Sequence, residues 1–251
     1  MAIPTTPNPV PENVTLCLTS CGRLDLLKRS LESFEAHNPG GALMISEDSA
    51  DPAMRDGIIA AFPHARLMWA PERLGLMRSI DRMYAEVKTP YLFHLEDDWL
   101  FDGPVDWAAL IRLLETRPDV SNVPVRHFDD IKPKYRARSD RAAVGDAVFQ
   151  VIHSDAHPEF FGWSSGPGLM RTKTYFDYAP FGRFLHDQVS AAIKRDGGRE
   201  AYLVPGLARH IGQERNVTDP TTPPRARTKL GKYVRWVKKR LYYAGLRKDP
   251  F

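Results

Sequence analysis

The feature that most constrains this sequence is a regular alternation between short runs of β-forming residues and segments with helical periodicity. Four such runs precede residue 100, and a helical segment with short connections separates each from the next. This pattern is typical of βαβ units, in which parallel strands form one sheet and helices cover both of its faces. We therefore predict an α/β fold with a mostly parallel sheet. The predicted strands are 14–19, 42–46, 65–69 and 91–95, and the helices between them are 24–35, 52–62 and 76–87.

The second half of the chain is less regular. Helical periodicity returns at 107–117 and 184–195, and a late strand is expected at 201–204. Between them, residues 122–150 are strongly charged and have no clear period, which indicates a loop or hairpin region. Polar clusters follow the predicted strands of the first half, where ligands bind in parallel sheets. They lie at 19–23, 47–48, 71–75 and 96–98.

Glu96, Asp97 and Asp98 stand side by side directly after the fourth strand. Adjacent carboxylates repel one another and are rarely buried unless they are paired or bound to a cation. Alternation along a strand puts Glu96 and Asp98 on one face and Asp97 on the other. Two co-facing carboxylates suit Mg²⁺ or Mn²⁺. The alternatives are pairing with nearby arginines or capping of the next helix, but the position after the fourth strand favours a metal site.

Composition restricts the class of protein. The chain has 251 residues, with 43% hydrophobic and 26% charged residues, as expected of a soluble globular protein. Residues 1–12 read as a flexible lead without the features of a signal peptide, and Cys17 and Cys21 offer no disulfide framework. We therefore expect a cytoplasmic protein. The net charge of +4 comes from the tail after residue 224, so the acidic body argues against nucleic-acid binding.

Four segments of the first half carry a family resemblance. In order and spacing, the sequence is similar to the nucleotide-binding half of a GT-A glycosyltransferase, of the inverting family 2 type. The segments are VTLCLTSCGRLDLLKRSLESF, ISEDSAD, PERLGLMRSIDRMY and YLFHLEDDW. The resemblance covers residues 13–215, with a nucleotide-binding half at 13–101 and an acceptor half at 102–215. It implies a metal-dependent enzyme that uses a nucleotide-sugar donor.

The resemblance assigns donor-binding roles to particular residues. The acidic triplet occupies the place of the family's DXD motif, with Asp98 as a direct metal ligand and with Glu96 and Asp97 near the donor. The first acid is Glu here rather than Asp, which leaves Glu96 to act through water on the metal or on the ribose. The remaining expected contacts to the nucleotide and diphosphate are Thr19, Arg23, Asp48, Arg73 and Arg78.

The resemblance also assigns the later site residues. The family has an acidic pair where this chain has His186 and Asp187, so Asp187 is expected to be the general base that deprotonates the acceptor hydroxyl. His210 matches a position that often completes the metal shell. The alternatives are a helix-stabilising role for Asp187 in the first turn of its helix, and an ordinary surface or core histidine at 210.

The segment FGWSSGPGLM at 161–170 is the expected acceptor-side loop. Trp163 would offer an aromatic face to a sugar, and Ser164 and Ser165 would offer hydroxyls. The alternative is a turn packed by ordinary core aromatics.

The basic tail, 216–251, contains apolar residues at near-helical spacing among lysines and arginines. This pattern predicts a basic amphipathic helix within 225–248 that binds an anionic membrane surface, where a lipid-linked acceptor would be available. The alternative is a charged helix that packs on its own domain or on a second subunit.

The sequence therefore predicts a peripheral, metal-dependent inverting glycosyltransferase that requires Mn²⁺ or Mg²⁺ and uses a glycan or lipid-linked acceptor. Two other functions remain open. A sugar-phosphate nucleotidyltransferase would share the sheet and the acidic site, but it would want a glycine-rich phosphate loop after the first strand, where this chain has only Gly22. A catalytically inactive module that binds glycans or membranes would not need the metal and base positions.

Overall fold

The fold is described from a computed structural model, which describes residues 6–222, 226, 228–243 and 246–247. The chain consists of two compact units, Met1–Thr218 and Asp219–Phe251. The first unit contains the sheet and the candidate site.

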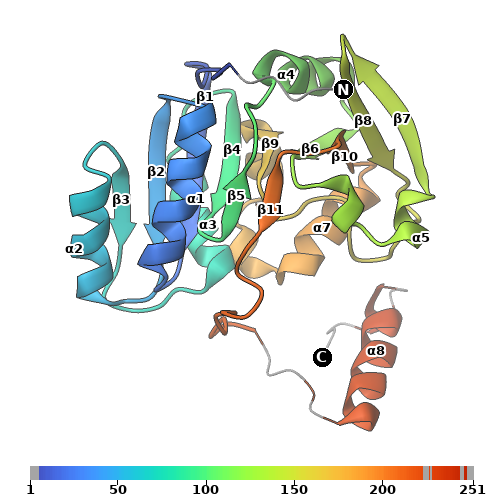
Figure 1. Cartoon of the computed structure of the whole chain (residues 1–251). Helices are drawn as coiled ribbons and strands as arrows, with labels where there is room; N and C mark the ends of the chain where they lie inside the picture. Colours follow the sequence, from blue (N-terminus) through green and yellow to red (C-terminus); the bar gives the residue numbers. More distant parts are fainter. Residues whose placement is uncertain (1–5, 223–225, 227, 244–245, 248–251) are drawn as a thin grey trace. The chain divides into compact units, whose positions relative to one another are not determined.

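The centre of the first unit is a nine-stranded sheet in the order β3-β2-β1-β4-β9-β6-β10-β8-β7 (Figure 1). Strands β3, β2, β1 and β4 are parallel, which confirms the predicted α/β fold with its parallel half. The strands of this sheet are Val14–Ser20 (β1), Ala42–Glu47 (β2), Arg66–Trp69 (β3), Tyr91–Glu96 (β4), Val120–Pro124 (β6), Ser139–Val144 (β7), Ala147–Ile152 (β8), Gly168–Arg171 (β9) and Arg199–Val204 (β10).

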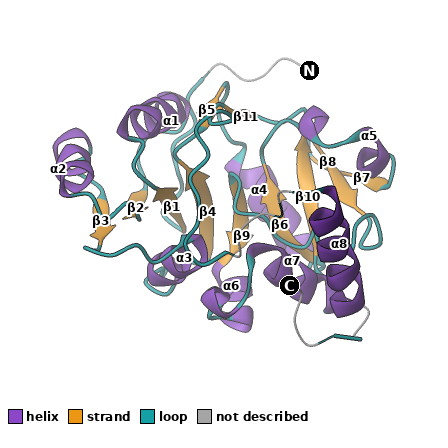
Figure 2. Cartoon of the chain, turned by 90° about the horizontal axis from the view of Figure 1, so that it is seen from below, coloured by secondary structure: helices purple, strands orange, loops and turns teal. Residues whose placement is uncertain are grey.

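Helices cover both faces of this sheet (Figure 2). Local sequence signals mark several of their ends: the Asp51 side chain accepts a hydrogen bond from Ala53 N at 2.8 Å before α2, and the Asp106 side chain caps α4 in the same way. The helices are Leu24–His37 (α1), Pro52–Ala61 (α2), Leu76–Tyr84 (α3), Trp107–Thr116 (α4), Pro133–Arg136 (α5), Thr172–Tyr178 (α6) and His186–Arg195 (α7), with short 3₁₀ turns at Phe128–Asp130 and Phe181–Arg183.

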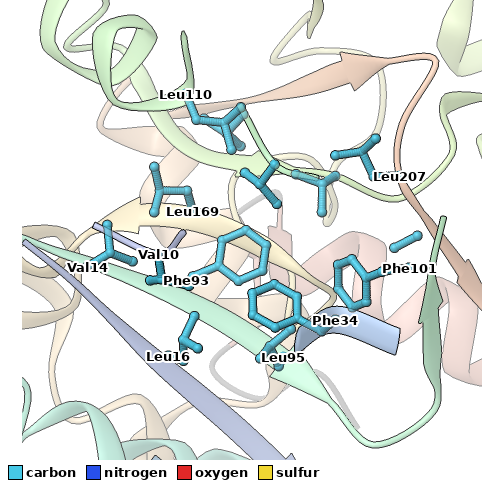
Figure 3. Close-up of a cluster of buried hydrophobic side chains, with 14 of the residues drawn as sticks. Val10, Val14, Leu16, Phe34, Phe93, Leu95, Phe101, Leu110, Leu169 and Leu207 are labelled. Carbon is cyan, nitrogen blue, oxygen red and sulfur yellow. The ribbon is translucent and has the colours of Figure 1, made fainter. Parts of the chain in front are cut away.

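Alternation along the central strands divides the core into two layers. Leu16 and Leu18 of β1 face the layer that holds α1, α2 and α4, whereas Cys17 faces the layer that holds α3, α6 and α7. In the first layer, the Phe34 ring packs edge-on against Phe101, with centroids 5.0 Å apart (Figure 3). All seven residues of β1 are buried, so both faces of this strand are covered.

The second half departs from the parallel pattern. β9 is antiparallel to both β4 and β6, and β7 and β8 form an antiparallel hairpin at the far edge. The hairpin falls in the charged region 122–150, where a loop or hairpin was expected. β7 is half-exposed at the sheet edge, so it does not need the apolar alternation that would have identified it as a strand.

A small second sheet stands beside the main one. It pairs Trp99–Phe101 (β5) with Ala208–His210 (β11) in antiparallel register, so that His210 lies opposite Trp99. β5 begins directly after the turn at 97–98. This pairing places the segment around His210, near the end of the first unit, next to the acidic triplet.

The N-terminal lead is held more firmly than expected. Asn8 N donates to His37 O at 2.9 Å, Val10 N donates to Pro39 O at 3.1 Å, and the Val10 side chain is buried. The prediction of a flexible lead is therefore wrong for residues 8–10, because backbone hydrogen bonds and an apolar contact fix them. Residues 1–5 of that segment lie outside the described residues.

The second unit contains one described helix, Lys229–Tyr243 (α8), as the basic amphipathic pattern predicts. Several large apolar side chains of α8 are exposed, namely Leu230, Tyr233, Val234, Trp236 and Leu241. Within the described residues, no helix is both long enough and apolar enough to cross a bilayer.

Candidate active site

The candidate site forms where β1 and β4 end side by side. Thr19 pairs with Glu96 in the parallel register of these strands, and Asp97 N donates to Thr19 O at 3.2 Å. After Glu96 the chain turns at Asp97 and Asp98 before β5 begins. The carboxyl ends of two neighbouring parallel strands thus bring the acidic triplet next to the segment that precedes α1.

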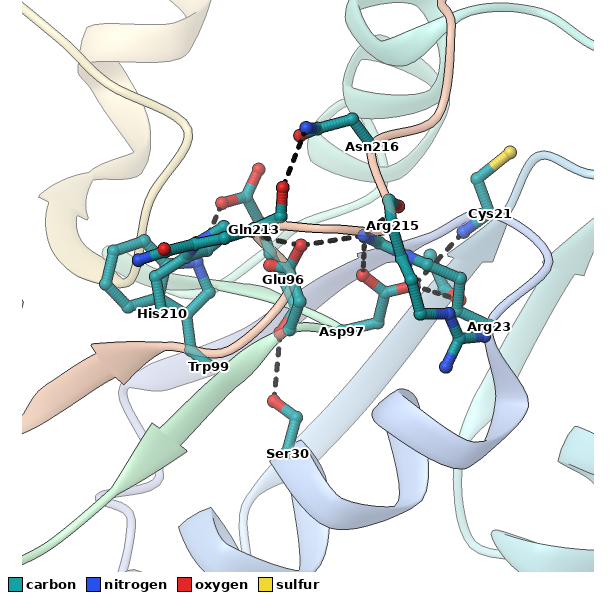
Figure 4. Close-up of polar contacts among 12 residues, drawn as sticks. Cys21, Arg23, Ser30, Glu96, Asp97, Trp99, His210, Gln213, Arg215 and Asn216 are labelled. Atoms are coloured by element: carbon teal, nitrogen blue, oxygen red, sulfur yellow. Dashed lines mark hydrogen bonds and ion pairs between the residues drawn. The ribbon is translucent and has the colours of Figure 1, made fainter.

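Arg23 is the basic partner of this triplet. Its guanidinium donates to both carboxylate oxygens of Asp97, with 3.2 Å between Nε and Oδ2, and its Nη1 lies 2.8 Å from Asp98 Oδ2 (Figure 4). The Asp97 side chain is only 1% exposed, and Ser20 Oγ also donates to it at 3.0 Å. Burial raises the pKa of Asp97, while the charge and hydrogen bonds of Arg23 oppose that rise. Arg23 therefore offsets the repulsion between the two aspartates.

Asp98 also contacts the returning C-terminal segment. His210 Nε2 lies 3.2 Å from Asp98 Oδ2, and the His210 ring packs edge-on against Trp99 with centroids 5.1 Å apart. Ile211 N donates to Asp98 O at 2.8 Å. The predicted ligands Asp98 and His210 are therefore adjacent, although 112 residues of sequence separate them.

Glu96 makes its own contacts beside this pair. Trp99 Nε1 donates to Glu96 Oε2 at 3.0 Å, and Ser165 Oγ lies 3.1 Å from Oε1. Burial, followed by the charge of Asp98, raises the pKa of Glu96 to about 8. Asp98 is also the carboxylate whose charge acts most strongly on Glu96, so the expected nearness of Glu96 and Asp98 stays a prediction. The structure adds that Asp97 and Asp98 share Arg23 at the 97–98 turn.

Asp98 and His210 fit a divalent cation in their donor chemistry. A carboxylate oxygen and an imidazole nitrogen both suit Mn²⁺, and such ions usually take one or two protein carboxylates and complete their shell with phosphates. Among the described residues, no group of three or more His, Cys, Asp or Glu side chains is arranged to hold a metal ion. The protein donors thus match a site that a substrate diphosphate would complete.

Asp48 and Arg73 form a second group beside the first. Asp48 Oδ1 accepts from Leu74 N at 2.6 Å and Oδ2 from Gly75 N at 3.0 Å, while Arg73 Nε donates to Asp48 O at 3.1 Å. Both oxygens of Asp48 therefore fix the loop that leads into α3. Arg78 is exposed in the first turn of that helix.

Thr19 is buried, and its hydroxyl lies 3.3 Å from His94 Nε2. Its side chain therefore lies beneath the surface of the site, and its predicted contact with the nucleotide stays a prediction.

The predicted acceptor loop is divided between the core and the site. Trp163 is 2% exposed and packs edge-on against Phe181, with ring centroids 5.1 Å apart. The prediction of a sugar-stacking face at Trp163 is therefore wrong, and the alternative of a core aromatic holds. Ser164 is half-buried, whereas Ser165 reaches Glu96. The sequence Phe161-Gly162-Trp163 does not indicate which of its aromatic rings packs into the core.

Asp187 lies in the first turn of α7 and is half-buried. Ser190, one turn later, accepts hydrogen bonds from Gly162 N at 2.9 Å and Trp163 N at 3.2 Å. The helix that carries Asp187 is therefore fastened to the loop whose Ser165 contacts the acidic triplet. This anchoring through Ser190 had no sequence signal, because isolated serines in helices are common.

Gly212 is a further residue that sequence reasoning missed. A Cβ atom at this position would lie 2.2 Å from Asp98 Oδ2, so only glycine leaves space for the aspartate. In the sequence, the position of Gly212 two residues after His210 gives only a weak indication that it belongs to the site.

Comparisons with known proteins address the fold. No family model and no curated protein matches the sequence. Among solved structures, GalNAc-T7 with UDP, GalNAc and Mn²⁺ aligns at TM-score 0.55 and 13% identity, over 92% of this chain and 50% of that one. The mannosyltransferase PcManGT from Pyrobaculum calidifontis, in complex with GDP-Man and Mn²⁺, aligns at 0.53 and 12%, over 80% and 57%.

Glucosyl-3-phosphoglycerate synthase from Mycobacterium tuberculosis, in complex with Mn²⁺ and UDP-Glc, aligns at TM-score 0.54 and 13% identity, over 99% of this chain and 89% of that one. The chain spans only about half the length of the first two structures. Identities this low show a common fold. The chain has the GT-A fold of these glycosyltransferases, as its first-half segments predicted.

Proposed function

We propose that this protein is a metal-dependent glycosyltransferase that moves a sugar from a nucleotide-sugar donor to an acceptor hydroxyl with inversion. The observation that carries the proposal is the convergence of Asp98, His210 and Arg23 at the carboxyl end of β4. The three solved structures compared above are complexes with Mn²⁺ and UDP, UDP-Glc or GDP-Man, which supports the choice of a nucleotide-sugar donor.

Asp98 and His210 would hold the cation together with the donor diphosphate. When bound, a divalent cation would neutralise the charge that develops on the leaving phosphate. Arg23 contributes a second positive charge at the same place, and Arg73 and Arg78 lie on and beside the loop before α3, where they can contact the nucleotide or diphosphate.

Asp187 is the proposed general base. A carboxylate on the far side of the sugar from the diphosphate can take the proton of the attacking hydroxyl, and this geometry inverts the anomeric centre. Ser164 and Ser165 belong to the proposed acceptor-side loop, where their hydroxyls contact Glu200 and Glu96 respectively. The acceptor class we propose is a glycan or a lipid-linked hydroxyl.

The proposal is tested by thermal unfolding of the full chain with UDP-Glc and GDP-Man, each with and without Mn²⁺. We expect a rise in Tm only when Mn²⁺ and one donor are present together, equivalent to about 2.7 kcal/mol at a donor concentration of one hundred times Kd. Asp98→Asn should remove this rise, whereas Glu86→Gln, in an exposed ion pair with Arg66, should retain it.

Two outcomes would support the alternatives. Stabilisation by a nucleoside triphosphate and a sugar phosphate, with release of pyrophosphate, would indicate a nucleotidyltransferase. Glycan binding that persists in Asp98→Asn, without donor binding, would indicate an inactive binding module.

We also propose that α8 docks on an anionic membrane surface from the cytoplasmic side. Its apolar residues Leu230, Val234 and Leu241 are spaced four and seven residues apart, which puts them along one side of the helix, and lysines and arginines occupy half of the other positions of α8. Such helices insert their apolar side into the interface while basic residues contact anionic headgroups. Residues 225, 227, 244, 245 and 248 of the proposed segment lie outside the described residues.

Co-sedimentation with phosphatidylcholine vesicles, with and without phosphatidylglycerol, tests this docking. We expect binding only to the anionic vesicles, weakened by salt and lost in the double variant Leu230→Ser, Val234→Ser. The proposal would be overturned if the protein bound neither kind of vesicle and instead formed dimers through α8. Such dimers would appear as an increase in mass with protein concentration, and the double variant would not show this increase.

A further inference from the structure

Glu200 is a buried carboxylate that the proposed chemistry does not use. It is the second residue of β10 and is 1% exposed. Tyr202 Oη donates to Glu200 Oε2 at 2.6 Å, Asn122 Nδ2 lies 3.3 Å from Oε1, and the Ser164 hydroxyl also donates to the carboxylate. Three donors from three segments therefore converge on one side chain.

A buried carboxylate at this position costs several kcal/mol of desolvation. An apolar side chain at position 200 would avoid this desolvation cost, and the next residue of the strand, Ala201, is indeed apolar and buried. Hydrogen bonds from the donors around Glu200 offset part of this desolvation cost. They can do so only while the donors keep their positions around the carboxylate. A carboxylate that accepts hydrogen bonds from several segments fixes those segments relative to one another. One of its partners, Ser164, belongs to the loop of the candidate site.

The Ser164 segment is fixed at several points. Ser121 Oγ donates to Gly162 O at 2.5 Å, Ser190 Oγ accepts from Gly162 N and Trp163 N, and Asn122 Nδ2 lies 3.4 Å from Ser164 O. The next residue, Ser165, contacts Glu96 of the acidic triplet at 3.1 Å. A continuous path of contacts thus runs from Glu200 through Asn122 to Ser164, and from the adjacent Ser165 to Glu96.

We propose that Glu200 is a positioning residue: by holding Asn122 Nδ2, which also contacts Ser164 O, together with the Ser164 hydroxyl, it fixes the 162–165 segment so that Ser165 orients Glu96 at the donor site. Glu200 itself touches neither donor nor acceptor. The proposal rests on the proposed function for its catalytic consequence, but the positioning of the loop stands independently of turnover.

The experiment compares Glu200→Gln with Tyr202→Phe. Glutamine keeps the shape but offers one oxygen and one NH₂ to three donors, so at least one donor loses its acceptor. Tyr202→Phe removes a donor from the same carboxylate but leaves the contact to Ser164, so it is a matched control for buried polar disruption. Both variants are expected to lower Tm by similar amounts.

Amide hydrogen exchange reports the position of the loop without requiring activity. We expect exchange in peptides that cover 162–166 to become about tenfold faster in Glu200→Gln, as for the loss of one hydrogen bond of ordinary strength, and to stay at the wild-type rate in Tyr202→Phe. Equal exchange in the two variants would overturn the proposal. If Glu200→Gln does not fold, Ser164→Ala breaks the same contact from the loop side and must give the faster exchange.

Kinetics then test the path to Glu96. In the wild-type background, Glu200→Gln should lower kcat/KM for the donor, and in a Ser165→Ala background the same substitution should have almost no further effect. Full additivity of the two substitutions would contradict the path through Ser165. A wild-type protein without any transfer would refute the proposed function, while the exchange result would still decide the role of Glu200.

Discussion

Arg23 and Asp98 face each other across the ends of β1 and β4, with 2.8 Å between Arg23 Nη1 and Asp98 Oδ2. The same guanidinium holds both oxygens of Asp97. One arginine therefore supplies the positive charge that two adjacent carboxylates need when they are largely buried. A divalent cation at Asp98 would share this task, which makes Arg23 and the metal competitors for the same oxygen.

Replacement of Arg23 by alanine should destabilise the protein strongly. Removal of one partner from a buried ion pair leaves an uncompensated charge and costs about 3–5 kcal/mol. We expect a loss of this size in the free energy of unfolding, measured by urea denaturation without metal. Mn²⁺ should then raise the stability of Arg23→Ala more than that of the wild type, because the oxygen of Asp98 is no longer occupied.

Arg112→Ala is the matched control for this measurement. Arg112 pairs with Glu115 on the exposed surface of α4, with 3.7 Å between Nη1 and Oε2. Its loss should cost less than about 1 kcal/mol. If Mn²⁺ stabilised Arg23→Ala no more than the wild type, competition between Arg23 and the metal would be refuted.

Gly212→Ala should disable the metal site while the fold persists. The added Cβ would lie 2.2 Å from Asp98 Oδ2 and 2.7 Å from Asp98 Cβ, so the aspartate must move. We expect about 1–3 kcal/mol of destabilisation from overpacking, together with loss of the Mn²⁺-dependent donor binding, measured by isothermal titration.

Gly166→Ala serves as the control for Gly212→Ala. Its Cβ would meet Trp99 at 3.7 Å, an ordinary van der Waals distance. Donor binding should survive in this variant. A Gly212→Ala protein that bound donor and Mn²⁺ normally would show that Asp98 can move without loss of the site.

Asp187→Asn should lower turnover and leave donor binding intact. The amide keeps the shape of the side chain but cannot accept the acceptor's proton, so we expect kcat to fall by about 10²–10⁴-fold. Single-turnover kinetics and donor titration separate the two effects. Asp196→Asn, at the opposite end of α7, is the control and should retain wild-type turnover. Undiminished kcat in Asp187→Asn would eliminate this residue as the base.

Asp119 gives a prediction for acid stability. Hydrogen bonds from Arg117, at 2.8 and 2.9 Å, and from Arg199 lower the pKa of Asp119 to about 2. The unfolded value is about 3.9, so this carboxylate stabilises the folded state above about pH 4. The contribution is lost as the pH falls from about 4 to about 2.

Asp119→Asn should therefore be less stable than the wild type at pH 7 by no more than about 1 kcal/mol, because the ion pairs are partly exposed to solvent. The difference in free energy of unfolding, measured by urea denaturation, should shrink as the pH falls below about 4. A difference that stays constant down to the lowest measurable pH would refute the assigned pKa.

Much of the fold could be predicted because its signals are local. The predicted helix at 52–62 and strand at 42–46 agree with α2 and β2 to within one residue, since periodicity and turn residues mark them within short windows of sequence. The acidic triplet was predicted to form a site from its place after the fourth strand, and this stays a prediction. Short elements such as β5 and β11 were missed, because three residues carry no readable period.

The sequence by itself determined that the chain forms a parallel α/β sheet and that polar residues meet at its carboxyl edge. Only the tertiary structure decided the partners at that edge: Arg23 with Asp97 and Asp98, His210 with Asp98, and Ser165 with Glu96. The physical reason is the range of the forces. Periodic burial acts between near neighbours, whereas an ion pair across 74 residues depends on strand register and on turns that no local pattern encodes.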